Sequence, residues 1–182
     1  DWLTANCNPG TTTVYVDMDG VLTEYYQAVA TYATNNGLLD SGGDWYNLTP
    51  EIELAALAAS AGSYFQNLAK RAEADALIDL VIAKNGSYEI LSTTTSTSMT
   101  NQKNAWIDAN LTGARAPAAR NYATGFNKGP YGGANKLLID DRLTYINQFE
   151  AAGGKGFKYF ESGGIRRFGG REASVGPVSL IS

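Results

Sequence analysis

The chain of 182 residues contains no histidine and only one cysteine, Cys7. The missing histidine excludes Ser-His-Asp and Cys-His catalysis, imidazole metal ligands and histidine pH switches. A single cysteine excludes an intrachain disulfide. There is no basic run and the formal net charge is −4, so a surface that binds duplex nucleic acid is disfavoured. No apolar run approaches the roughly 20 residues of a membrane span. No signal peptide is visible, and we expect no membrane contact and a cytoplasmic, intracellular location.

Hydrophobic residues make up 44% of the chain, which is enough for the core of one domain. Segments typical of strands alternate with segments of helical periodicity. We expect strands at 14–16, 88–91, 136–139 and 157–160, a short one within 122–127, and helices at 24–35, 51–60, 69–85, 100–110 and 143–152. This alternation predicts an α/β fold, a three-layer Rossmann-like arrangement with a mostly parallel sheet covered by helices on both faces.

The most informative motif is Asp-x-Asp-Gly, in which Asp17 and Asp19 follow a β-type run and precede Gly20. If the chain turns at Gly20, both carboxylates can face one point above the edge of the sheet. One could attack a phosphorus centre while the other handles the proton of the leaving oxygen, provided that a metal ion offsets the charge. The alternative is that this motif forms a solvated turn. A calcium-binding loop is excluded, because its twelfth position would be Ala28 instead of glutamate.

Polar groups follow two further predicted strands. The first set begins the Ser/Thr-rich run 92–98, for which a plain polar loop is the alternative, and the second is Asp140 with Asp141. The carboxyl ends of parallel strands meet at one edge of the sheet, so we expect both sets to lie beside Asp17. A lysine that reaches the same place is expected in the glycine-rich loop around Lys128. Its rivals are Lys103 and Lys136.

This order of motifs resembles that of the haloacid dehalogenase (HAD) superfamily of phosphatases, from Val14 to about Phe160. Within the superfamily the chain is most similar to the 5′(3′)-deoxyribonucleotidase type. The segments that carry this closer resemblance are 17–22, 64–68, 103–107 and 138–142. Two features depart from that type. Thr94-Thr95-Ser96 stands where a proline is usual, and two additional residues separate Lys128 from the Asp-Asp strand.

The resemblance implies a role for each matching residue. Asp17 would be the nucleophile and Asp19 the general acid and base. Lys128 would neutralise the phosphate and the nucleophile. The phosphate-binding hydroxyl groups would come from Ser92, Thr93 and Thr94. Thr93 is preferred as the residue that holds the phosphoryl oxygens, and Ser92 takes its place if the strand ends one residue sooner. Mg²⁺ would be the cofactor. Its implied ligands are Asp17, Asp19 through its main-chain carbonyl, Asp140 and Asp141.

The resemblance also implies one HAD-like domain whose core covers about 11–23 and 69–182. A small helical cap of about 24–68, the cap segment, is inserted after the first strand. Caps of this kind exclude water and select the substrate. We expect Trp45 and Phe65 to stack on a nucleobase, although aromatic residues of the cap segment could equally form its own core.

These observations favour a magnesium-dependent phosphomonoester hydrolase with an aspartyl-phosphate intermediate. The expected substrate is a small phosphorylated molecule, in first place a (deoxy)nucleoside 5′-monophosphate. Two alternatives stay open: a phosphatase for polynucleotide ends or another phosphometabolite, and a HAD-fold binding or assembly module within a larger complex.

Overall fold

The fold is built on a five-stranded sheet in which every neighbouring pair is parallel. The computed structural model describes residues 2–39 and 48–159, so Trp45 and the segment after residue 159 lie outside the described residues. The strands are β1 (Thr13–Val16), β2 (Glu89–Thr93), β3 (Arg120–Ala123), β4 (Lys136–Asp140) and β5 (Lys155–Lys158), in the spatial order β3-β2-β1-β4-β5. The predicted α/β class with a parallel sheet is confirmed.

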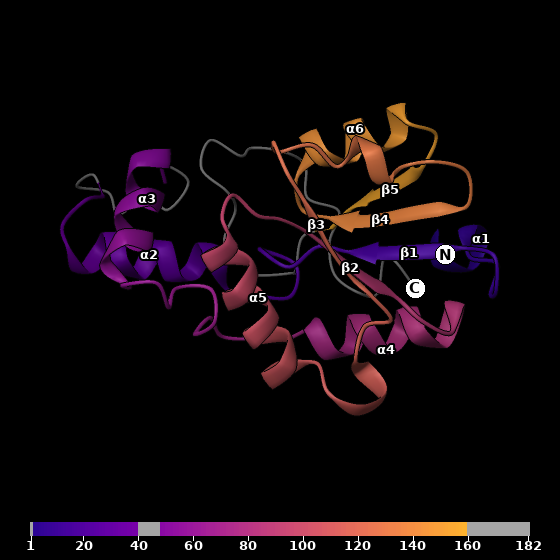
Figure 1. Ribbon diagram of the computed structural model, residues 1–182, viewed down its shortest axis with the longest axis horizontal. Coiled ribbons are helices and arrows are strands. Elements are labelled where there is room, and N and C mark those ends of the chain that lie inside the picture. The colour runs from indigo at the N-terminus through magenta and orange to yellow at the C-terminus, as the bar shows by residue number, and fades with distance from the viewer. Residues whose placement is uncertain (1, 40–47, 160–182) are drawn as a thin grey trace.

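Helices cover both faces of this sheet, as Figure 1 shows, with α6 on one face and α4 and α5 on the other. The helices are α1 (Trp2–Asn6), α2 (Tyr25–Asn35), α3 (Pro50–Ala59), α4 (Ala74–Asn85), α5 (Thr97–Asn110) and α6 (Leu143–Ala151). Two short 3₁₀ turns, Gly113–Arg115 and Gly129–Tyr131, lie in connections. The sequence analysis did not predict α1, which is only one turn long.

Several predicted element boundaries were wrong. Helix α4 does not begin at Ala69, because Lys70 forms a bridge with Thr23 and the Arg71 N–H donates to the Leu22 carbonyl over 2.9 Å. The strand predicted at 88–91 continues to Thr93, and the helix predicted from residue 100 already begins at Thr97. Ser96 caps this helix by accepting a hydrogen bond from the Met99 N–H over 3.1 Å, so the run 92–98 is not simply a polar loop.

Two hydrophobic clusters pack against opposite faces of the sheet. The side chains of a strand alternate between its faces, and β1 shows this with Val14 and Val16 in the larger cluster and Tyr15 in the smaller one. The larger cluster includes buried residues of α4 and α5, and the smaller one contains Ile146 and Phe149 of α6. The three-layer arrangement therefore follows directly from the alternation in β1.

The chain direction across the sheet reverses beside β1, because β2 and β3 lie on one side of it and β4 and β5 on the other. Open parallel sheets bind ligands at such a point, outside the carboxyl ends of the strands. The turn after β1 requires Gly20, which has a φ of +82°. A Cβ atom there would also overlap the Asp141 carboxylate. Glycine thus allows the first motif to approach the end of β4.

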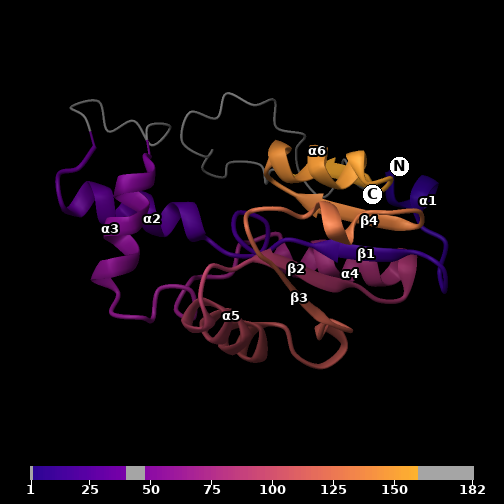
Figure 2. The same ribbon diagram turned by 45° about the horizontal axis from the view of Figure 1, so that its top comes forward.

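Helices α2 and α3 lie beyond the carboxyl ends of the strands, apart from the layers that cover the sheet (Figure 2). Helix α3 begins as predicted, with Pro50 in its first turn and the Thr49 hydroxyl accepting from the Ile52 N–H over 3.4 Å. The cap segment shares one hydrophobic cluster with the sheet, since Val29 of α2 and Val16 of β1 both belong to it. Among the described residues, no helix has the length and apolar character needed to cross a membrane.

Candidate active site

Three buried carboxylates meet at the carboxyl end of the sheet. Asp17 follows β1, Asp140 ends β4 and Asp141 comes next. One oxygen of each carboxylate lies within 4.8 Å of the others. Hard divalent cations prefer carboxylate oxygens, and Mg²⁺ usually takes a few of them and completes its octahedron with water and substrate oxygens. The set of donor atoms present here therefore fits Mg²⁺.

Lys128 is the lysine that the structure places in this cluster. Its ammonium donates to Asp17 Oδ1 over 2.8 Å, to Asp140 Oδ2 over 2.6 Å and to the Leu91 carbonyl over 3.0 Å. These contacts use all three donors of a lysine, and the side chain is fully buried. Its rival Lys136 lies at the start of β4, at the other end of the sheet, where it donates to Thr13 Oγ1.

The cluster perturbs the acid–base properties of its members. Burial, followed by the charge of Asp140, raises the pKa of Asp17 to about 6, against the opposing effect of Lys128. Burial alone would lower the pKa of Lys128, but the carboxylates of Asp140 and Asp17 outweigh it and the pKa is raised. Two of the three carboxylates thus share one ammonium, and a divalent cation would offset the excess negative charge.

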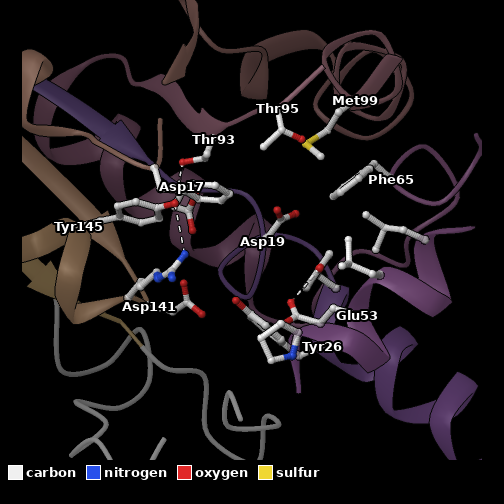
Figure 3. Close-up of a pocket in the computed structure, with 16 residues that line it drawn as sticks. Asp17, Asp19, Tyr26, Glu53, Phe65, Thr93, Thr95, Met99, Asp141 and Tyr145 are labelled. Carbon is white, nitrogen blue, oxygen red and sulfur yellow. Dashed lines mark hydrogen bonds between the residues drawn. The ribbon is translucent and has the colours of Figure 1, made fainter. Parts of the chain in front are cut away.

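Asp19 occupies the centre of the cavity in Figure 3, between Asp17 on one side and Phe65 and Glu53 on the other. Its side chain is 23% exposed, and its Oδ2 accepts from the buried ammonium of Lys103 over 3.0 Å. Burial raises the pKa of Asp19, while Lys103 opposes this shift. An acid at this place in the cavity, next to Asp17, could exchange a proton with a bound molecule.

The three candidate hydroxyl groups have different surroundings. Thr93 lines the cavity, and its hydroxyl donates to the Tyr145 hydroxyl over 2.9 Å. Ser92 is buried and accepts from Lys103 over 2.7 Å. Thr94 is buried and accepts from Thr100 over 3.0 Å. Of these three, Thr93 is the residue that the structure places at the cavity.

The cavity has a volume of about 410 Å³, and both polar and apolar side chains line it. The polar side chains include those of Asp17, Asp19, Thr93, Asp141 and Arg142, and the apolar or aromatic ones those of Tyr26, Leu54, Leu57, Phe65, Met99 and Phe126. Glu53 is the acidic residue that α3 contributes, and it accepts from the Tyr25 hydroxyl over 2.9 Å.

Of the two aromatic residues expected to stack on a nucleobase, Trp45 and Phe65, the structure describes only Phe65. Trp45 lies outside the described residues. Phe65 lines the cavity but is only 5% exposed. Its ring contacts Tyr25, with a centroid distance of 5.8 Å and an interplanar angle of 18°, and Tyr64 at 5.4 Å. These contacts favour the alternative that Phe65 belongs to the core of the cap segment.

The sequence analysis missed Phe126, a cavity residue that is 55% exposed. Its φ of +53° is rare for a residue other than glycine. The carboxamide of Gln148 holds this loop, because it donates to the Phe126 carbonyl over 3.1 Å and accepts from the Lys128 N–H over 3.0 Å. Only the position of Phe126, two residues before Lys128, could have drawn attention to it.

Comparison with solved structures supports the fold. No protein-family model matches the chain, and no curated protein matches it. A haloacid dehalogenase-like family hydrolase from Xanthomonas campestris is similar over 84% of both chains, with a TM-score of 0.55 and 11% identity. The L-2-haloacid dehalogenase from Xanthobacter autotrophicus matches over 81% of this chain and 77% of its own (TM-score 0.54, 11% identity). A HAD hydrolase from Bacillus subtilis, described as bound to magnesium, covers 80% and 87% (TM-score 0.51, 14% identity). The chain thus has a HAD-like fold.

Proposed function

We propose that this chain is a magnesium-dependent phosphomonoester hydrolase that acts through an aspartyl-phosphate intermediate. The observation that supports it most is the placement of Asp17 and Asp19 in the lining of one cavity, with Lys128 bonded to Asp17. Asp140 and Asp141 complete the group. A nucleophile, an acid and a source of positive charge are the parts that phosphoryl transfer to a carboxylate needs.

The proposed reaction has two displacements. An oxygen of Asp17 bonds to phosphorus while the ester P–O bond breaks, and Asp19 gives its proton to the departing oxygen. Asp19 then takes a proton from water, the water oxygen bonds to phosphorus, and the Asp17 carboxylate departs with inorganic phosphate as the product. Mg²⁺, held by Asp17, Asp140, Asp141 and the carbonyl of Asp19, would offset the charge of the phosphoryl oxygens.

The perturbed pKa values suit these roles. With a pKa of about 6, Asp17 is mostly ionised at neutral pH and can act as a nucleophile. The pKa of Asp19 is raised by burial, which favours retention of a proton for the leaving oxygen. Two carboxylates with different surroundings can therefore take different roles in one site.

A haloacid dehalogenase activity is the contrasting possibility for this fold. Halide leaves as a stable anion and needs no proton, so Asp19 would have no role in such a displacement. A reaction at carbon also gives no reason to gather Asp140 and Asp141 beside Asp17. An alkoxide leaving group needs an acid, and a phosphate dianion needs positive charge near the nucleophile. The arrangement therefore favours phosphate esters.

For the substrate, we propose a (deoxy)nucleoside monophosphate. The apolar side chains that line the cavity suit a flat, mostly uncharged group attached to the phosphate, and the exposed residue Phe126 offers a surface for stacking. Glu53 can accept hydrogen bonds from such a group and would repel a second phosphate. The resemblance of segments 103–107 and 138–142 to deoxyribonucleotidases supports the same choice.

One screen tests the proposal. Phosphate release is measured with mononucleotides, sugar phosphates and phosphate-ended oligonucleotides, each with Mg²⁺ and with EDTA, and halide release is measured with 2-chloropropionate. We expect Mg²⁺-dependent phosphate release, largest with a mononucleotide, and no halide. If a sugar phosphate or an oligonucleotide end is preferred, the proposed substrate class is wrong and the preferred compound takes its place. Halide release, or no turnover by the folded protein, would overturn the proposed activity.

A further inference from the structure

Lys103, on α5, is a buried charged residue to which the mechanism above gives no role. Its side chain is 1% exposed. A buried ammonium is costly unless every donor finds a partner. The three partners here are Asp19 Oδ2 at 3.0 Å, Ser92 Oγ at 2.7 Å and the Thr93 carbonyl at 2.8 Å.

These contacts leave no donor of Lys103 for a substrate, because a lysine has three. Lys103 is also not among the residues that line the cavity. Its charge therefore acts on a substrate through Asp19, whose carboxylate does line the cavity. The other oxygen of Asp19 accepts a longer bond, 3.4 Å, from the Thr23 hydroxyl. Lys103 thus provides the shorter of the two contacts that orient this carboxylate.

The helix that carries Lys103 is itself tied to the end of the cap segment. The Gln102 side-chain oxygen accepts from the Phe65 N–H over 3.0 Å, and the buried Trp106 indole donates to the Leu68 carbonyl over 2.8 Å. The Lys103 ammonium also lies 4.9 Å from the centre of the Phe65 ring. With neighbours on both sides fixed, Lys103 has little freedom to move away from Asp19.

We propose that Lys103 is a positioning residue that holds the Asp19 carboxyl group in line with the leaving oxygen. This inference rests on the proposed phosphohydrolase function. A positioned acid accelerates proton transfer by about 10²–10⁴-fold, and a small displacement of a reacting group can cost about 100-fold. Loss of Lys103 should therefore slow the reactions that need the proton of Asp19 and largely spare those that do not.

The test uses Lys103→Met and two esters of nearly equal shape, 4-nitrobenzyl phosphate and 4-nitrophenyl phosphate. The first releases an alkoxide that needs a proton, and the second a stable phenolate that does not. The rate of alcohol or phenol release in the first turnover is measured, so that later hydrolysis of the intermediate does not enter. We expect a loss of roughly 10- to 100-fold with the benzyl ester and less than about 5-fold with the phenyl ester.

Matched variants decide between positioning and general destabilisation. Lys155→Met, which removes an exposed lysine on β5 that contacts Asn6, should change neither rate. Adding Lys103→Met to Asp19→Asn should cause little further loss, because the two residues act as one unit. If Lys103→Met does not fold, Ser92→Ala removes one of the ammonium's partners without removing the charge, and a smaller loss with the same dependence on the leaving group is expected.

Equal losses with both esters, or full additivity with Asp19→Asn, would overturn the positioning role while leaving the phosphohydrolase function intact. Failure of the wild-type protein to cleave these esters and every phosphate ester of the screen above would instead contradict the proposed function itself. The two failures are therefore distinguishable in a single set of measurements.

Discussion

The ammonium of Lys128 and the carboxylate of Asp17 form a hydrogen bond of 2.8 Å between residues 111 positions apart in the chain. Asp140 shares the same ammonium at 2.6 Å. Lys128 therefore holds the end of β1 and the end of β4 together by charge. Lys128 contacts Oδ1 of Asp17, and in the proposed reaction the other oxygen of Asp17 attacks phosphorus.

Asp17→Asn should abolish phosphate release while the fold stays intact. The amide has nearly the shape of the carboxylate, and its oxygen can still accept from Lys128, but it is not a nucleophile. We expect phosphate release to fall by at least about 10³-fold, given that covalent catalysis is lost entirely. The measurement is phosphate release with Mg²⁺, with circular dichroism to show that the variant is folded.

The matched control for this change is Asp79→Asn, which removes an exposed carboxylate that pairs with Arg115 over 2.8 Å on the surface. It should keep wild-type turnover. Near wild-type turnover of Asp17→Asn would exclude the aspartyl-phosphate route.

Magnesium should bind the cluster and stabilise the folded protein. A ligand that binds only the folded state raises its melting temperature, so Mg²⁺ should raise the Tm of the wild-type protein and EDTA should remove its activity. Asp140→Asn loses a charged oxygen ligand, and we expect its Mg²⁺ affinity to fall by roughly 10–100-fold or more. Isothermal titration calorimetry checks the affinity. Activity that survives EDTA would contradict the metal role even if the nucleophile is correct.

The strand ends were predictable because several independent signals coincide there. Val14 and Val16 precede Asp17, and a similar apolar run precedes Asp140, so both carboxylates were expected at the same edge of a parallel sheet. The structure places them there. Helix α3 was predictable from Thr49 and Pro50, because the cap and the following proline are local signals.

Other features depend on contacts that are distant in sequence. The start of α4 is delayed because Arg71 bonds to Leu22, and no local pattern reveals such a pairing. Phe65 is buried by Tyr25 across the cap segment, so its exposure could not be judged from polar neighbours in sequence. The Lys103 ammonium pairs with the carboxylate of Asp19, which lies 84 positions away in the chain. Helical periodicity indicates on which face of its helix Lys103 lies, but it does not identify this partner.

The raised pKa of Asp17 predicts a pH-dependent stability of the metal-free protein. The folded carboxyl has a pKa of about 6, whereas its ordinary value is 3.8. Between these values the folded state binds more protons than the unfolded state, so stability falls as pH rises from about 4 to about 6 and stays reduced above that. The difference between the two pKa values corresponds to a loss of about 3 kcal/mol in the free energy of unfolding.

The measurement is the Tm of the wild-type protein minus that of Asp17→Asn, in EDTA, from pH 4 to pH 8. Asparagine does not titrate, so the subtraction isolates Asp17. We expect this difference in Tm to fall by roughly 6–12 °C at most as pH rises. Adding Mg²⁺ at pH 8 should restore part of the lost difference in Tm. A difference that is flat or rises with pH would show that Asp17 is not desolvated as the structure indicates.

The proposed stacking of a nucleobase on Phe126 gives the last prediction. Phe126 lines the cavity and is 55% exposed, whereas Phe65 is 5% exposed and packed against other rings. Removing a stacking ring should cost about 1–3 kcal/mol of binding, and the loss should appear in KM more than in kcat because the ring does not touch phosphorus. Phe126→Ala should therefore raise KM for a nucleoside monophosphate and leave KM for glycerol phosphate nearly unchanged.

Two comparisons make this prediction sharp. Phe126→Leu keeps an apolar side chain at the same backbone conformation, so a KM between those of wild type and Phe126→Ala separates stacking from simple apolar contact. Phe65→Ala opens a cavity among buried rings, and such changes typically cost about 3–5 kcal/mol of stability. It should lower the Tm and impair both substrates alike. The opposite outcome, in which Phe65→Ala selectively raises the nucleotide KM and Phe126→Ala has no effect, would return base stacking to the ring of the cap segment and remove Phe126 from the site.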